Sequence, residues 1–240
     1  MNNTSRLRGA LVVLFGLSAL GCESLPAGIG DALRGSGGAG ALDEGTIADG
    51  LREALRVGSE RAVGNVSKVN GFLANELIRI ATPKELEKMT STLRKIGFGS
   101  QVDELETSMN RAAEKASGEA TAIFWEAVQG LTIADARAVL GGGRHAATKL
   151  LRDRTSSQLS SRIHPIVGEK MRDVGLSRLY GDLAARYNAL PLGQKPAIDL
   201  EEYVTGKTLD GVFSVLAKEE ERIREDPMAR TTELLQRVFR

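Results

Sequence analysis

The sequence predicts an all-α fold, a single bundle-like domain of about eight to ten helices without a β-sheet. Two observations support this prediction. From Thr46 onward, apolar residues recur at the three- and four-residue spacing of helices that bury one face. In the same region, no segment shows the sustained alternation of apolar and polar residues that is typical of strands. Capping residues, glycines and prolines interrupt the helical pattern and place the individual helices.

Terminal signals locate most of the helices. A first helix is predicted at about 47–66, with Thr46 as its N-cap. Thr82 followed by Pro83 predicts the start of a helix that stops near Gly97. Further helices are expected at 101–116, 120–131, 133–140, 145–154, 156–174, 176–188, after Asp199 and after Pro227.

Two segments depart from the regular pattern. Residues 70–81 contain apolar side chains but no clear helical period, so no element is predicted there. Pro165 lies inside the segment 156–174. Because proline lacks an N–H group and its ring clashes with the preceding turn, we expect it to kink or divide this helix.

The first 21 residues resemble a secretory signal peptide. Arg6 and Arg8 precede an apolar run at 9–20, which is shorter than the roughly 20 residues that cross a bilayer. The segment 18–22 (SALGC) resembles a bacterial lipobox, in which the signal is cut before the cysteine and the thiol is acylated. We therefore expect residues 1–21 to be a signal peptide and Cys22 to carry a lipid anchor.

An ordinary cleavage site is the alternative, and it would leave Cys22 unmodified. Cys22 is the only cysteine of the chain, so a free thiol would have no partner in an oxidising compartment, and this favours lipidation. Glu23 occupies the position at which an aspartate would retain a lipoprotein at the inner membrane. Because no aspartate is present there, we expect the chain at the periplasmic face of the outer membrane. The glycine-rich residues 22–45 are predicted to be a lipidated, flexible tether for a helical domain at 46–240.

Composition argues against a nucleic-acid partner. The chain has 32 basic and 31 acidic residues and a net charge of +1, so no large positive field exists to attract phosphates. Aromatic residues make up only 4% of the sequence, which is low for a surface that stacks bases. The contact with a membrane is therefore expected to come from the lipid on Cys22.

Catalytic and metal-binding patterns are missing from the sequence. The only histidines, His145 and His164, are 19 positions apart and lack the spacing of paired zinc ligands. No G-x-S-x-G nucleophile motif occurs. Residues 141–144 could offer backbone N–H groups to an anion ahead of a helix, but a helix-breaking loop is the favoured interpretation. We therefore predict no metal site, no cofactor and no catalytic residue.

A polar stripe beside the apolar face of helix 101–116 is the best candidate for a specific site. Glu106, Asn110 and Glu114 follow each other at four-residue spacing, which places them on one side of the helix. The favoured interpretation is a network with caps and loops of neighbouring helices. An acid–base pair of Glu106 and Glu114, as in a hydrolase, is the alternative. Trp125 lies off the apolar stripe of its own helix, where it either packs against a second neighbour or lines a groove.

One stretch of this helix, 108–116 (SMNRAAEKA), is distinctive. Further distinctive stretches are 51–55 (LREAL), 123–125 (IFW), 132–133 (TI), 187–191 (YNALP), 203–205 (YVT), 226–227 (DP) and 229–232 (ARTT). As a set they resemble a bacterial family known as domain of unknown function 4197, over about Thr46 to Arg240. Arg144 and His145 depart from the acidic residue that many members carry at this loop.

The resemblance implies a secreted or lipid-anchored envelope protein without an assigned activity. Together with the signal sequence, it leads us to expect a periplasm-facing lipoprotein that serves as a non-enzymatic binding or structural module. Its expected partners are the membrane and an envelope protein. The alternative is a carrier that holds a lipid or another hydrophobic ligand in a cavity between its helices.

Overall fold

A computed structural model describes residues 43–191, 193–194 and 196–239. These residues form nine α-helices and no strand, which confirms the predicted all-α class. None of the helices in the described ranges is long and apolar enough to cross a membrane. The predicted signal peptide, Cys22 and nearly all of the 22–45 tether lie outside the described residues.

The helices follow each other with short connections, except between α2 and α3 and between α8 and α9. The α-helices are α2 (Glu44–Val66), α3 (Glu87–Lys95), α4 (Gly99–Ser117), α5 (Ala120–Gln129), α6 (Ile133–Leu140), α7 (Ala146–Asp173), α8 (Leu176–Asn188), α9 (Leu200–Glu225) and α10 (Glu233–Val238). Two 3-10 turns precede α3 and α10, namely η1 (Lys84–Leu86) and η2 (Pro227–Ala229).

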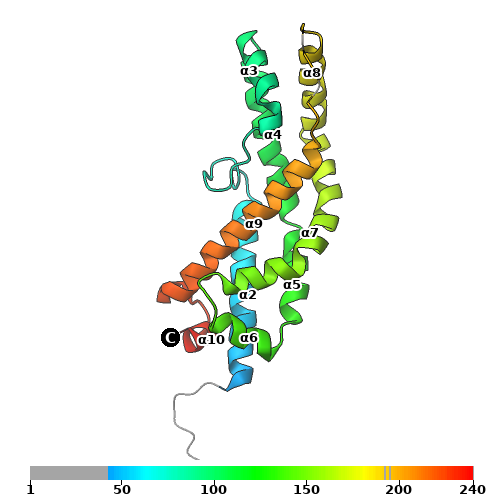
Figure 1. Cartoon of the computed structure of the whole chain (residues 1–240). Helices are drawn as coiled ribbons and strands as arrows, with labels where there is room; N and C mark the ends of the chain where they lie inside the picture. The colour runs from blue at the N-terminus through cyan, green and yellow to red at the C-terminus, as the bar shows by residue number, and fades with distance from the viewer. Residues whose placement is uncertain (1–42, 192, 195, 240) are drawn as a thin grey trace, which may run out of the picture. The chain divides into compact units, whose positions relative to one another are not determined.

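Helix α9 makes the two most extensive helix–helix interfaces of the described structure, with α2 and with α7. It runs obliquely across α2 and also packs on α4 and α7 (Figure 1). Both α7 and α9 bury residues at regular four-residue spacing, which forms the ridges that pack helices at about 50° to each other. On α7 these residues are Ala147, Leu151, Thr155, Leu159, Ile163, Val167 and Met171. On α9 they are Leu200, Val204, Thr208, Val212, Leu216 and Glu220.

Three helix boundaries differ clearly from the sequence-based expectation, and the first of these differences has a local cause. Helix α2 begins at Glu44 because the side chain of Asp43, rather than that of Thr46, is the N-cap and accepts the Thr46 N–H at 3.0 Å. The last residues of the predicted tether are therefore helical. Thr82 does not cap a helix, and Pro83 precedes a 3-10 turn. The backbone just before them is held in a non-helical path by side chains of α4 and α9, as described below.

The third difference is that α7 is one continuous helix. It crosses both the predicted break at 155 and Pro165. Its buried face continues at the same spacing on both sides of Pro165, and the Thr155 hydroxyl donates to the Leu151 carbonyl at 2.7 Å. Burial of this face against α4, α5 and α9 outweighs the single backbone hydrogen bond that proline removes.

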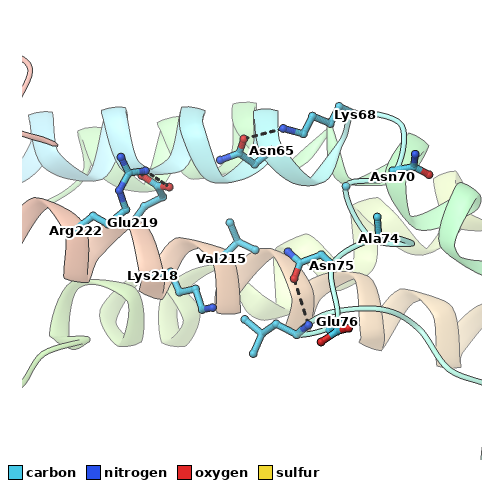
Figure 2. A pocket seen from close by; sticks show the side chains of 12 residues that line it. Asn65, Lys68, Asn70, Ala74, Asn75, Glu76, Val215, Lys218, Glu219 and Arg222 are labelled. Carbon is cyan, nitrogen blue, oxygen red and sulfur yellow. Dashed lines mark hydrogen bonds and ion pairs between the residues drawn. The ribbon is translucent and has the colours of Figure 1, made fainter.

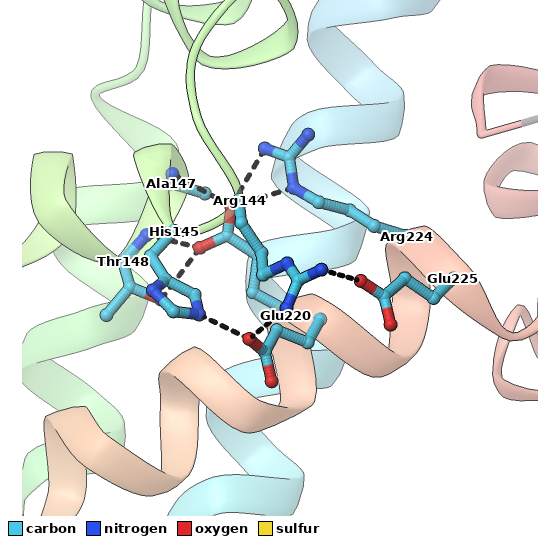
Figure 3. A network of polar contacts seen from close by, with 8 residues as sticks. Arg144, His145, Ala147, Thr148, Glu220, Arg224 and Glu225 are labelled. Atoms are coloured by element: carbon cyan, nitrogen blue, oxygen red, sulfur yellow. Dashed lines mark hydrogen bonds and ion pairs between the residues drawn. The ribbon is translucent and has the colours of Figure 1, made fainter.

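The N-terminus of α7 is capped by a carboxylate from another helix (Figure 3). His145 precedes α7 without a capping side chain of its own. Glu220 on α9, only 8% exposed, accepts the N–H groups of Ala147 at 3.0 Å and Thr148 at 2.8 Å. Arg224 neutralises the same carboxylate with bonds of 2.9 and 2.8 Å. The backbone groups that an anion would need at this helix end are therefore occupied by Glu220.

The Arg144 and His145 side chains pair with α9 at the surface next to this cap. His145 Nε2 lies 2.8 Å from Glu221, and Arg144 lies 3.1 Å from Glu225. The hydrogen bond with His145 is the main reason that the pKa of Glu221 is lowered from its usual value. These residues thus connect the loop before α7 to α9.

We predict that Glu220 is much more important for stability than its exposed neighbour Glu225. Replacing Glu220 by Ala leaves Arg224 unpaired and two helix N–H groups without an acceptor, so the free energy of unfolding should fall by about 3 kcal/mol. Glu225→Ala removes a surface pair and should cost less than about 0.5 kcal/mol. Denaturant titrations of both variants test this, and equal losses would contradict the capping role of Glu220.

Candidate functional site

The long connection between α2 and η1, residues 67–83, is the most irregular part of the described structure. Non-helical segments of this length inside a compact domain need an explanation, because they are either functional or poorly ordered. Phe72 anchors this connection with a fully buried ring against α9. Gly211 makes room for it, since a Cβ atom at this position would overlap the Phe72 ring.

Asn110 of the predicted polar stripe binds this connection directly. Its Oδ1 accepts the Ile80 N–H at 2.9 Å, and its Nδ2 donates to the Ile80 carbonyl at 2.9 Å. A second Nδ2 bond of 2.8 Å goes to the Glu106 carbonyl one turn earlier on α4. Asn110 is completely buried. Its amide supplies Ile80 with the two hydrogen bonds that a neighbouring strand would supply in a sheet.

Glu114 holds the same connection at its first half. One carboxylate oxygen accepts the N–H groups of both Phe72 and Leu73 at 3.1 Å. The other accepts from Arg111 at 2.6 Å, and Arg111 also donates to the side chain of Asn70 at 2.9 Å. The charge of the buried Glu114 is thus compensated by an arginine and by two backbone donors.

Glu106 and Tyr203 complete the attachment near the end of the connection. Arg79 donates to Glu106 with bonds of 2.8 and 2.7 Å. The Tyr203 hydroxyl, from α9, donates to the Ala81 carbonyl at 2.9 Å. Burial is the main reason that the pKa of Tyr203 is raised, so the hydroxyl keeps its proton across the physiological range. These contacts fix the extended path before Pro83.

The structure therefore brings the three stripe residues together with one loop and leaves Trp125 elsewhere. Trp125 lies on α5, is 46% exposed and lines a separate small cavity of about 70 Å³. In that cavity the buried Ser59 hydroxyl has no hydrogen-bond partner in the described structure. The Glu106 carboxylate bonds to Arg79, whereas the Glu114 carboxylate bonds to Arg111 and to two backbone N–H groups. Both carboxylates are thus engaged in attaching the loop to α4.

The attached loop forms one wall of an open groove of about 870 Å³ (Figure 2). The end of α2 and the middle of α9 form the other sides. Its polar lining includes Asn65, Lys68, Asn70, Asn75, Lys218 and Arg222. Sequence reasoning missed this groove, because its residues come from an unassigned segment and from a charge-rich helix end. The only available signal was the five-residue spacing of the three asparagines.

The described ranges contain no group of three or more His, Cys, Asp and Glu side chains that could hold a metal ion. His145 pairs with Glu221, and His164 lies 3.6 Å from Glu202, so each histidine has a single acidic neighbour.

We predict that Asn110→Ala releases the loop. The substitution leaves the N–H and the carbonyl of Ile80 unpaired, which should lower the free energy of unfolding by about 2 kcal/mol. Because the loop then opens more often, trypsin should cleave after Arg79 about tenfold faster or more. Asn188→Ala, which removes an exposed amide at the end of α8, is the matched control. Unchanged cleavage after Arg79 would contradict the role given to Asn110.

Comparisons with known proteins complete this description. No curated protein and no solved structure gave a significant match. A family model described as a protein of unknown function (DUF4197) matches residues 41–240, which include every element described above. This match confirms the family resemblance of the sequence: the chain belongs to the DUF4197 family.

Proposed function

We propose that the chain is a lipid-anchored, periplasm-facing envelope protein whose helical domain is a non-enzymatic binding module. The proposed location is supported by the N-terminal sequence, in which basic residues, an apolar run of limited length and Cys22 follow each other as in bacterial lipoproteins. Stable anchoring requires two or more acyl chains, which the modification of a lipoprotein cysteine supplies.

The groove beside the loop carries the proposal of a binding role. Its loop wall is held by Asn110, Glu114 and Glu106, and these contacts use buried or partly buried side chains of a regular helix. Binding sites are commonly found on loops that a rigid scaffold positions in this way. A wall that is already ordered loses little conformational entropy when a partner binds. The groove is therefore the surface that best fits a binding module.

A hydrophobic carrier is the second candidate, and the structure supports it less. The cavity between α2, α7 and α9, next to Leu55 and Leu216, measures about 20 Å³. The cavity beside Trp125 measures about 70 Å³. Sites for drug-sized ligands are usually about 300–1,000 Å³, so a lipid chain in either of these cavities would require the helices to separate. A hollow of about 540 Å³ beside Ala138 and Leu150 is within this range, but it is open to solvent.

The anchor is tested by mass spectrometry and fractionation. We expect the mature chain from bacterial cells to begin at Cys22, to carry the mass of its acyl chains and to sediment with membranes. Cys22→Ser should lose this mass and leave the membrane fraction. A mature N-terminus at Cys22 without acyl mass would contradict the anchor and leave the helical domain unaffected.

The binding role is tested by photo-crosslinking in cells. A photoreactive amino acid is placed at Leu77, which lines the groove and is 54% exposed, or at Ile96, which is 47% exposed at the end of α3. We expect a specific adduct from position 77 that is absent from position 96. Its yield should fall at least about fivefold with Cys22→Ser, because the chain is then released from the membrane at which the partner is expected. Identical adduct patterns from both positions would contradict the groove as the binding surface.

A further inference from the structure

Hydrogen-bond donors dominate the inner surface of the groove. Asn65 accepts from Lys68 at 3.3 Å, and Asn70 accepts from Arg111 at 2.9 Å. The third asparagine, Asn75, accepts the N–H of Leu77 at 3.2 Å. All three side-chain oxygens are thus engaged, whereas the NH₂ groups have no partner in the part of the chain that the structure describes. A ligand in this groove could therefore accept hydrogen bonds from these amides in place of water.

Positively charged groups add further donors. Lys68 and Lys218 lie on opposite sides of the groove in Figure 2, and neither forms an ion pair with a described residue. Arg222 uses only Nη1 to bind the buried Glu219, at 3.0 and 3.2 Å, which leaves Nε and Nη2 available. The groove lining contains these three cations and two carboxylates, Glu76 and Glu219. Glu219 is neutralised by Arg222.

Apolar side chains border this donor-rich surface. Leu77 lines the groove with half of its surface exposed. Val215 of α9 contributes a further apolar group to the lining. A small anion or a sugar polymer would leave these side chains unused. A peptide offers backbone carbonyls, carboxylates and apolar side chains at the same time.

We propose that the groove binds an acidic segment of a partner protein that carries apolar residues between its carboxylates. The carboxylates pair with Lys68, Lys218 and the free side of Arg222, and the peptide carbonyls accept from the three asparagines. The apolar side chains pack on Leu77. This assignment rests on the proposed binding function and specifies the chemistry of its partner.

Fluorescence anisotropy with a defined probe tests the proposal. The full chain in neutral detergent is titrated into a labelled peptide of alternating Glu and Leu, with a Gln-for-Glu peptide as the neutral comparison. We expect the acidic peptide to bind at least about tenfold more tightly than the neutral one. The double variant Lys68→Glu/Lys218→Glu should weaken binding of the acidic peptide by about tenfold or more, and added salt should do the same.

A matched charge reversal separates a specific site from general electrostatics. Lys88 and Lys95 are exposed on α3, outside the groove, so Lys88→Glu/Lys95→Glu changes the net charge equally and should retain wild-type affinity. Thermal unfolding of both double variants verifies that each is folded. Equal affinity of the wild type and the groove variant, or equal loss in both double variants, would overturn the proposal.

Two further probes identify a different anionic ligand. These probes are a soluble polygalacturonate and vesicles that contain phosphatidylglycerol. The peptide assignment is overturned if either probe binds through Lys68 and Lys218 while the acidic peptide does not bind. A crosslink from position 77 without binding of the acidic peptide would overturn only the proposal that the partner segment is acidic. The proposed binding role of the groove would then stand. The absence of both would overturn the proposed binding function as well.

Discussion

The pairing of Asn110 with the backbone of Ile80 is the interaction on which the arrangement of the groove depends. The buried Asn110 amide binds both the N–H and the carbonyl of Ile80, and this fixes Ile80 against α4. Glu114 does the same for Phe72 and Leu73, and the ring of Phe72 is then inserted against Gly211 of α9. Each of these contacts would leave a buried polar group unsatisfied if the loop moved away. The loop is therefore held mainly by the cost of exposing or orphaning these groups, and much less by local turn propensity.

Three consecutive carboxylates on α9 show how one helix serves different neighbours. Because successive residues on a helix point about 100° apart, Glu219, Glu220 and Glu221 face three different directions. Glu219 is buried beside the groove with Arg222, Glu220 caps α7, and Glu221 binds His145 at the surface. One turn of α9 thus contributes to the groove, caps α7 and binds the loop before α7.

Periodicity and capping were sufficient to predict the helical class and most helix bounds, because both depend on residues close in sequence. Helix α8 was predicted with its observed bounds, 176–188, since Gly175 adopts the positive φ of 76° that a break between helices favours. The path of 67–83 could not be predicted, because it is set by Asn110 and Glu114, which are about 30 to 40 positions away. The i, i+4, i+8 spacing located the stripe correctly, but spacing alone does not reveal whether a carboxylate faces solvent, a substrate or a backbone N–H.

The stripe residues already use their polar groups in hydrogen bonds, and this limits the chemistry that they can perform. A catalytic carboxylate must change its protonation state or its bonding during the reaction, and Glu114 can do neither without releasing the N–H groups of Phe72 and Leu73. The same bonds that make it unsuited to acid–base chemistry keep the loop wall of the groove in place. On the groove side of that loop, Lys68 and Asn75 present accessible donors. A rigid wall with accessible donors would suit the proposed acceptor-rich partner, because neither the loop nor its amides need to reorganise when the partner arrives.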